Sequence, residues 1–291
     1  MNWPKISIVT PNLNQEVFLE QTILSVLNQN YPNLEYIIID GGSTDSSLSI
    51  IKKYETQLFY WISEKDKGLY DALNKGFCKS TGEVMMYINS DDILLAQSLS
   101  TIGMTFEKFK NIRWLNGIHT FIDEKSRIVE SKKPTIFTIY DYLMLNYQWI
   151  QQESTCWRRS LWEESGSKFN ENLKLAGDLD LWSRFFLIEQ LYFLNTTIGA
   201  FRFREGQLSA NNLDNYHQEA IASLKLLKSQ ITKFQRVQLL KIKLLLIIQK
   251  VLKYSVIFDL YIFRKITLIT LEKIKSKPKI YSINTQNLKI E

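Results

Sequence analysis

Glu35-Tyr-Ile-Ile-Ile-Asp40-Gly-Gly-Ser-Thr-Asp45 is the stretch that decides the fold, because in it an apolar run stops abruptly at an acidic loop. Such a run is typical of a buried strand in a parallel sheet. A second stretch, Val84-Met-Met-Tyr-Ile-Asn89-Ser-Asp91-Asp92, has the same form. Parallel strands bring their carboxyl ends to one edge, where open α/β sheets bind ligands. We therefore predict that both acidic loops belong to one site.

The chemistry of these loops suits a nucleotide sugar. Gly41 and Gly42 allow a sharp turn and a close approach of the backbone to a ligand. Carboxylates from two loops suit a divalent cation that is bound to a diphosphate, because hard cations prefer oxygen ligands.

Strand-like and helix-like runs alternate through the first 118 residues. We expect strands at 6–10, 36–39, 59–62, 84–88 and 114–118, and helices at 17–29, 46–54, 69–78 and 97–109. This alternation predicts an α/β fold with a mostly parallel sheet, helices on both faces and right-handed crossovers. Further helices are expected at 139–145 and 178–188. No Pro/Gly/Ser-rich linker divides the chain into independent domains.

Charge is distributed unevenly along the 291 residues. The net charge is +6, but residues 225–291 hold 15 Lys or Arg and three acidic residues, a net +12, which leaves −6 for residues 1–224. We therefore separate a basic helical tail, 225–291, from a body, 1–224. The basic residues alternate with Leu and Ile rather than with aromatic residues, so we expect no nucleic-acid partner.

The tail has two interpretations. No apolar stretch in it approaches the roughly 20 residues that a bilayer span needs. Apolar residues with interspersed Lys suit an amphipathic helix on an anionic membrane surface; alternatively, the helices pack on the body and their Lys side chains are solvated. The N-terminus shows no signal peptide, and Cys78 and Cys156 are too few and too far apart for a disulfide framework. We expect a cytoplasmic protein, peripheral at the inner membrane face if the tail binds lipid.

Six segments, in this order, resemble family-2 glycosyltransferases. They are Ser7-Ile-Val-Thr-Pro-Asn-Leu-Asn14, Leu24-Ser-Val-Leu-Asn-Gln29, Asp40-Gly-Gly-Ser-Thr-Asp45, Ser63-Glu-Lys-Asp-Lys-Gly-Leu-Tyr-Asp-Ala-Leu-Asn-Lys-Gly76, Asn89-Ser-Asp-Asp92 and Gly177-Asp-Leu-Asp-Leu-Trp182. The resemblance covers about the first 210 residues. It implies the GT-A fold, an inverting mechanism, a nucleotide-diphosphate sugar donor and usually Mg or Mn. The body then divides into a nucleotide-binding half, 1–118, and an acceptor-side half, 119–224.

The resemblance also implies which residues bind the donor. They are Pro11, Asn14, Asp40, Gly42, Asp45, Asp66, Lys67, Gly68, Asp71, Asn74, Asn89 and Asp91. Asn89 stands at the first acidic position of the family's DxD motif, and Asn is a weaker cation ligand than Asp. This change leaves Asp91 and Asp92 as the expected metal ligands.

The family places an aspartate at position 40 against the nucleobase. We favour that role here, because a carboxylate at a strand end before two glycines lacks a local donor. The alternative is that Asp40 and Asp45 shape a turn and cap the helix that opens at Ser46.

The resemblance implies that Asp178 is the base that takes the acceptor's hydroxyl proton. Family members commonly have Glu-Asp here, whereas this chain has Gly177 before the aspartate. Asp180 is the alternative base, and Asp178 could also serve as a helix cap. Processive members carry a Gln-x-x-Arg-Trp motif that this chain lacks, so single-sugar transfer is expected. Gln151-Gln152-Glu153, Arg158 and Arg159 are expected in the acceptor wall without assigned roles.

The predicted function is inverting transfer of one sugar to a glycan or polyprenyl-linked acceptor in cell-surface polysaccharide synthesis. Two alternatives stay open. A degenerate sugar-nucleotide-binding module would explain Asn89 and Gly177. A nucleotidyltransferase would use similar carboxylates, but residues 11–14 lack the Gly-rich basic loop that it needs.

Overall fold

One mixed sheet forms the centre of the molecule. The computed structural model describes residues 2–133, 138–145, 149–207, 212–252, 267–271, 274, 280–284 and 287–290. The strand order is β11-β10-β9-β6-β8-β4-β1-β2-β3, with β5 paired to β9 and β7 to β6. The strands are β1 Ile6–Asn12, β2 Leu34–Asp40, β3 Tyr60–Ser63, β4 Val84–Tyr87, β5 Ile93–Leu94, β6 Trp114–Ile122, β7 Ile128–Lys132, β8 Thr155–Arg158, β9 Tyr192–Arg202, β10 Ile280–Asn284 and β11 Asn287–Ile290.

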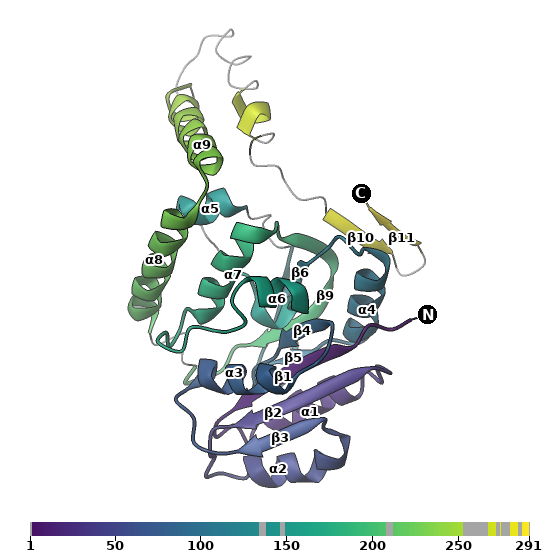
Figure 1. Ribbon diagram of the computed structural model, residues 1–291. Coiled ribbons are helices and arrows are strands. Elements are labelled where there is room, and N and C mark those ends of the chain that lie inside the picture. Colours follow the sequence, from purple (N-terminus) through teal and green to yellow (C-terminus); the bar gives the residue numbers. More distant parts are fainter. Residues whose placement is uncertain are drawn as a thin grey trace.

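Helices cover both faces of this sheet (Figure 1). The helices are α1 Leu19–Leu27, α2 Ser47–Tyr54, α3 Leu69–Lys79, α4 Ser98–Lys108, α5 Ile139–Leu143, α6 Arg159–Glu164, α7 Gly177–Ile188, α8 Leu213–Gln230 and α9 Lys233–Leu252. Helices α1, α2 and α4 share one buried cluster, and α3, α6, α7 and α8 share the other.

The pattern of β2 explains this arrangement. Ile37 and Ile39 pack into the cluster with α3 and α7, whereas Tyr36 and Ile38 pack into the cluster with α1 and α4. Successive side chains of a strand point to opposite faces, so only a continuous apolar run can fill both cores. Strands β3, β2, β1 and β4 are all parallel, so their carboxyl ends meet at one edge. The predicted α/β fold is confirmed.

Beyond β4 the sheet is mixed, and the sequence did not reveal all of its strands. Strand β8 runs antiparallel to both β4 and β6. Strand β9 lies beside β6 and was not predicted, because Asn195, Thr196 and Thr197 interrupt its apolar pattern. The register between β6 and β9 shifts at this polar segment.

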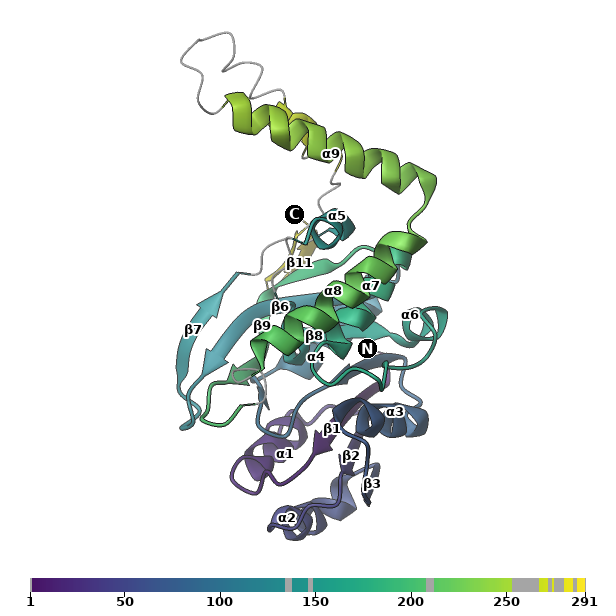
Figure 2. The same cartoon turned by 90° about the vertical axis from the view of Figure 1, so that its left-hand side faces the viewer.

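The predicted boundary at 224/225 falls inside α8. Leu224 and Leu227, on either side of it, are both 2% exposed in the same core cluster. The break between the last body helix and the projecting helix lies at 231–232, before α9 (Figures 1 and 2). Residues 253–266 of the predicted tail lie outside the described residues. Within the described part, the helices lack the length and apolarity that a membrane crossing requires.

Candidate functional site

Asp40 lies at the end of β2 and is fully buried. Its carboxylate accepts hydrogen bonds from Asn12 Nδ2 at 2.7 Å, Ser63 Oγ at 2.6 Å and the Ser43 backbone N–H at 3.0 Å. Burial raises its pKa, but these bonds outweigh burial and hold the pKa below the usual value. The premise that Asp40 lacks a local donor is therefore wrong. Its carboxylate organises the loop between β2 and α2.

The side chains of Asn14 and Asp45 are also bonded to backbone N–H groups of this region. Asn14 Oδ1 accepts a backbone N–H from the loop after β2, at 2.8 Å. Asp45 accepts the N–H of Ser47 at the start of α2, at 2.9 Å, so its carboxylate shapes the turn before the helix, while the N-cap residue is Ser46. Gly42 has φ of +85°, a conformation that favours glycine. Pro11 lies buried within β1.

Asp66 is the carboxylate that this loop cluster leaves incompletely bonded. Its Oδ1 accepts the Gly68 N–H at 2.8 Å, while Oδ2 makes no hydrogen bond within the described residues. A Cβ atom on Gly41 would lie 2.6 Å from that Oδ2, so only glycine lets the two loops approach so closely. Burial raises the pKa of Asp66, and the charges of Asp71 and Asp40 raise it further.

The next predicted residues mainly stabilise α3. Asp71 accepts the Lys67 backbone N–H at 3.0 Å and pairs with Lys75 at 3.4 Å. Asn74 donates to the Phe169 carbonyl at 3.1 Å and accepts the Phe169 N–H at 2.7 Å. Both ends of the Asn74 amide are therefore occupied by the loop that precedes α7. Its contact with the donor stays a prediction.

Asp92 lies beneath the loop that follows β4. It is 1% exposed, and its two oxygens accept the Arg202 backbone N–H at 2.9 Å and Gln152 Nε2 at 3.2 Å. Burial raises its pKa well above the usual value, and the charges of Asp91 and Glu153 add to the shift. Both Asp92 oxygens are thus occupied by protein donors. Of the two predicted metal ligands, Asp91 is the more accessible.

Asp91 lies in the same loop and is less buried than Asp92. Its Oδ2 accepts Arg204 Nε at 2.7 Å, and its side chain is 15% exposed. Asn89 Oδ1 is buried and finds no hydrogen-bond partner in the described part of the chain. The described residues contain no cluster of three His, Cys, Asp or Glu that could hold a metal alone. Asp91 and Asn89 do supply oxygen atoms of the kind that Mg and Mn prefer, and the remaining ligands would be phosphates and water.

Asp178 is the second residue of α7 and is partly exposed. Burial raises its pKa to about 6, against the effect of backbone N–H groups at the start of the helix. The preceding Gly177 donates its N–H to Tyr70 Oη at 2.8 Å. A Cβ atom on Gly177 would lie 2.5 Å from the Tyr70 ring. The Tyr70 ring therefore occupies the space that a side chain at position 177 would need.

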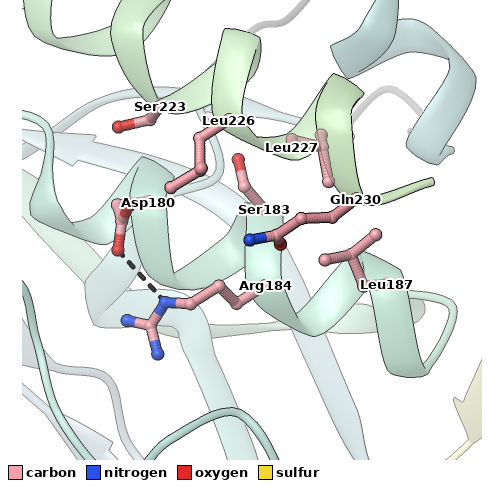
Figure 3. A pocket seen from close by; sticks show the side chains of 8 residues that line it. All are labelled: Asp180, Ser183, Arg184, Leu187, Ser223, Leu226, Leu227 and Gln230. Carbon is pink, nitrogen blue, oxygen red and sulfur yellow. Dashed lines mark hydrogen bonds and ion pairs between the residues drawn. The ribbon is translucent and has the colours of Figure 1, made fainter.

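Asp180 points elsewhere (Figure 3). It pairs with Arg184 at 3.1 Å, and both line a crevice of about 10 Å³ between α7 and α8. Ligand pockets usually measure about 300–1,000 Å³, so this crevice is too small for a substrate. Of the two aspartates, the geometry favours Asp178 as the base.

Glu153 is a site residue to which the sequence gave no role. It is 1% exposed, and neither carboxylate oxygen has a hydrogen-bond partner within the described segments. Burial raises its pKa to about 8, and the charges of Asp91 and Asp178 contribute. Glu153 is therefore a buried, unpartnered carboxyl group that senses the charges of both Asp91 and Asp178.

Arg202 and Arg204 were also missed. Both follow from Phe201-Arg-Phe-Arg204, whose alternation places two arginines on one side of a strand end. Arg202 is fully buried; its Nε donates to the Asp91 carbonyl at 2.6 Å, and its guanidinium lies 4.7 Å from the Phe18 ring centroid. The alternation was the available signal.

The fold and the acidic edge define a class of protein. Residues 1–349 of S. aureus TarS in complex with UDP-GlcNAc match with a TM-score of 0.65 at 17% identity, over 93% of this chain and 81% of that one. A Pyrobaculum calidifontis mannosyltransferase in complex with GDP-Man and Mn²⁺ matches with a TM-score of 0.59 at 15% identity, over 80% and 66% of the two chains. The fold is thus an α/β, GT-A-like fold, as predicted.

The sequence places the chain within that class. Residues 7–175 match the model of Glycosyl transferase family 2, and the chain belongs to this family. An uncharacterised glycosyltransferase of Haemophilus influenzae is 35% identical over 150 residues, which are 50% of this chain and 58% of that protein. The GalNAc(5)-diNAcBac-PP-undecaprenol beta-1,3-glucosyltransferase of Campylobacter jejuni is 33% identical over 103 residues, 34% of this chain and 33% of that protein. The matches to the two H. influenzae relatives span about 60% of their length.

Proposed function

We propose that this chain transfers a single sugar, with inversion, from a nucleotide-diphosphate sugar to a hydroxyl of a glycan or lipid-linked saccharide. The observation that supports the proposal is that Asp91, after β4, and Asp178, at the start of α7, are both partly exposed and both lie near enough to the buried Glu153 for their charges to raise its pKa. One carboxylate sits where a diphosphate would be bound, and the other is a partly exposed carboxylate with a raised pKa. Inverting transfer needs this separation of leaving-group and base functions.

Asp178 is proposed as the general base. Its pKa of about 6 keeps it ionised at neutral pH, yet closer to neutrality than an ordinary aspartate. It would take the proton from the acceptor hydroxyl while that oxygen attacks the anomeric carbon and the bond to the nucleotide breaks. Tyr70 and Gly177 fix the start of α7 and so orient Asp178.

Asp91 and Asn89 would hold a Mg or Mn ion together with the diphosphate. The buried Asn89 Oδ1 has no partner among the described residues and suits this role. Such an ion neutralises the negative charge that develops on the departing diphosphate. Solved structures with UDP-GlcNAc and with GDP-Man and Mn²⁺ support this donor class. Asp66, with one oxygen open at the same edge, is proposed to contact the nucleotide, as are Lys67 and Gly68.

Mn²⁺ should strengthen the binding of a nucleoside diphosphate, and Asp91→Asn should remove the gain. A neutral amide is a weaker ligand for a hard cation than a carboxylate. Calorimetry with UDP and with GDP, in Mn²⁺ and in EDTA, measures both effects. Asp92→Asn is the matched control, because Asp92 is buried under the loop. Equal affinities of the wild type in Mn²⁺ and EDTA would exclude the ion from donor binding.

A donor screen tests the reaction itself. The full chain is incubated with UDP-, GDP- and dTDP-sugars, and release of the nucleoside diphosphate is measured with and without saccharide acceptors. Acceptor-dependent release supports the proposal. Binding without turnover on every donor and acceptor would favour the degenerate binding module, and release of inorganic diphosphate from a nucleoside triphosphate would favour the nucleotidyltransferase.

We further propose that the acceptor is lipid-linked and that the reaction belongs to cell-surface polysaccharide synthesis. The Campylobacter relative is named for an undecaprenol-diphosphate-linked acceptor. In this chain, α9 exposes an apolar stripe with a helical spacing of three or four residues. The stripe consists of Phe234, Val237, Leu240, Leu244 and Ile247, each at least 49% exposed. Lys233, Arg236, Lys241, Lys243 and Lys250 accompany it, and this combination suits the anionic inner face of a membrane.

The full chain should float with anionic vesicles at low salt and not with neutral ones. Lys and Arg near an anionic surface each contribute about 1 kcal/mol, and salt screens this attraction. Leu240→Glu with Leu244→Glu should abolish flotation, because both leucines lie on the exposed stripe. Val129→Glu, on the equally exposed β7, is the control. If the wild type ignores anionic vesicles, α9 is not a membrane helix. Truncation at 224 is unsuitable because it cuts α8.

A further inference from the structure

The acidic residue at the centre of the proposed metal site already has a cationic partner. Arg204 Nε lies 2.7 Å from Asp91 Oδ2, and the two side chains are only 17% and 15% exposed. An ion pair that is largely removed from solvent is screened less than a surface pair. A divalent cation would therefore meet a carboxylate that Arg204 already partly neutralises.

The position of Arg204 is fixed by the strand that precedes it. Two residues earlier, the buried Arg202 guanidinium donates to the Asp91 carbonyl at 2.6 Å and to the Asp123 carbonyl at 3.1 Å. Its backbone N–H also binds Asp92. The end of β9 is thus tied to the loop after β4 at several points. Arg204, on the same side of the chain, is carried to the open side of Asp91.

Arg204 also has free donor capacity. Its Nη1 makes a long contact of 3.3 Å with the Glu205 carbonyl, and Nη2 makes no hydrogen bond within the described residues. Arg204 lines an open cavity formed by residues within 123–127 and 203–207. A guanidinium can bind a phosphate with two parallel hydrogen bonds.

We propose that Arg204 binds the diphosphate of the donor directly and competes with the divalent cation for Asp91. This inference rests on the proposed function. It adds a residue that binds the diphosphate and a mode of binding that needs no metal. A nucleoside diphosphate then binds this chain without metal, and the metal adds only a few-fold. When a cation takes Asp91, the guanidinium turns from the carboxylate to the phosphate oxygens.

Calorimetry on the full chain tests this with UDP and with GDP as probes, each in EDTA and in Mn²⁺. Wild type should bind at least one of them in EDTA. Arg204→Ala should weaken binding in EDTA by about tenfold or more, the scale of losing a charge-assisted hydrogen bond to phosphate. The same variant should show a larger gain from Mn²⁺ than wild type, because Asp91 is released. Arg204→Lys should recover part of the affinity in EDTA.

Two further variants test whether the change in affinity is specific to Arg204. Arg127→Ala removes a charge that lines the same cavity but pairs with Asp123 at 2.6 Å, and it should leave both affinities unchanged. Asp91→Asn should abolish the Mn²⁺ gain while preserving binding in EDTA, and Arg204→Lys, with weaker binding in EDTA than wild type, reads out the proposal if Arg204→Ala does not fold. Unchanged affinity of Arg204→Ala in EDTA overturns the proposal, as does an equal loss under both conditions. If wild type binds neither nucleotide under any condition, the proposed function itself fails.

Discussion

Asp178→Asn is expected to lower kcat by roughly 10²–10⁴-fold, the usual contribution of a general base. An asparagine fills the same space and can still accept the Leu179 N–H, which lies 2.7 Å from Asp178 Oδ1. It cannot take a proton from the acceptor. Affinity for the nucleoside diphosphate should stay close to wild type, because the nucleotide is proposed to lie against Asp91 and Asp66. Steady-state kinetics and calorimetry on the same preparation separate the two effects.

The pH profile supplies a second readout for Asp178. Burial raises its pKa to about 6, so the carboxylate is ionised above that pH and protonated below it. Wild-type kcat/KM should therefore fall as the pH drops below about 6, and the residual activity of Asp178→Asn should lack this limb. Asp180→Asn is the control, since Asp180 pairs with Arg184 between α7 and α8. Turnover of Asp178→Asn at half the wild-type value would assign the base to another group.

Arg202→Met should cost on the order of 3–5 kcal/mol of unfolding free energy, because a group that loses its hydrogen-bond partner inside the protein costs about 1–3 kcal/mol and Arg202 serves several. The variant keeps an apolar stem over Phe18, but the Asp91 and Glu124 carbonyls lose the guanidinium donor and the Asp123 carbonyl keeps only the Ser126 N–H. For a domain of this size the Tm should fall by on the order of 10 °C. Thermal unfolding by circular dichroism measures this shift.

A matched surface arginine provides the comparison for Arg202. Arg127→Met removes a side chain that is 73% exposed, and its effect should stay within about 0.5 kcal/mol. Arg202→Lys should not restore stability, because a single ammonium cannot reach the separate carbonyls that the planar guanidinium bridges. A Tm of Arg202→Met within about one degree of wild type would show that the end of β9 does not depend on this residue.

The sheet edge could be predicted from sequence because its signal is local. The continuous apolar runs in β2 and β4 are fully buried, and the polar loops follow them directly. Roles within the loops could not be predicted, because they depend on partners far away in the chain. Asp40 seemed to lack a donor, yet Ser63 reaches it from β3, 23 residues later. No local pattern records such a bond.

The adjacent Asp91 and Asp92 show the same limit more sharply. In sequence they are equivalent carboxylates, but the backbone of Arg202, 110 residues away, binds Asp92 and turns it inward. Because the polar residues 195–197 kept β9 from being predicted, Arg202 and Arg204 at its end were not predicted either. For Asp178 and Asp180 the sequence told more, because side chains two residues apart on a helix point to different sides. Sequence alone could not tell which direction faces the site.

The contact between Gly177 and Tyr70 joins α3 and α7 across 107 residues of sequence. Any side chain at position 177 would bring its Cβ atom within 2.5 Å of the Tyr70 ring. A larger residue there therefore requires the Tyr70 ring to move, and the start of α7 would move with it. The glycine before Asp178 thus lets α3 set the position of the proposed base.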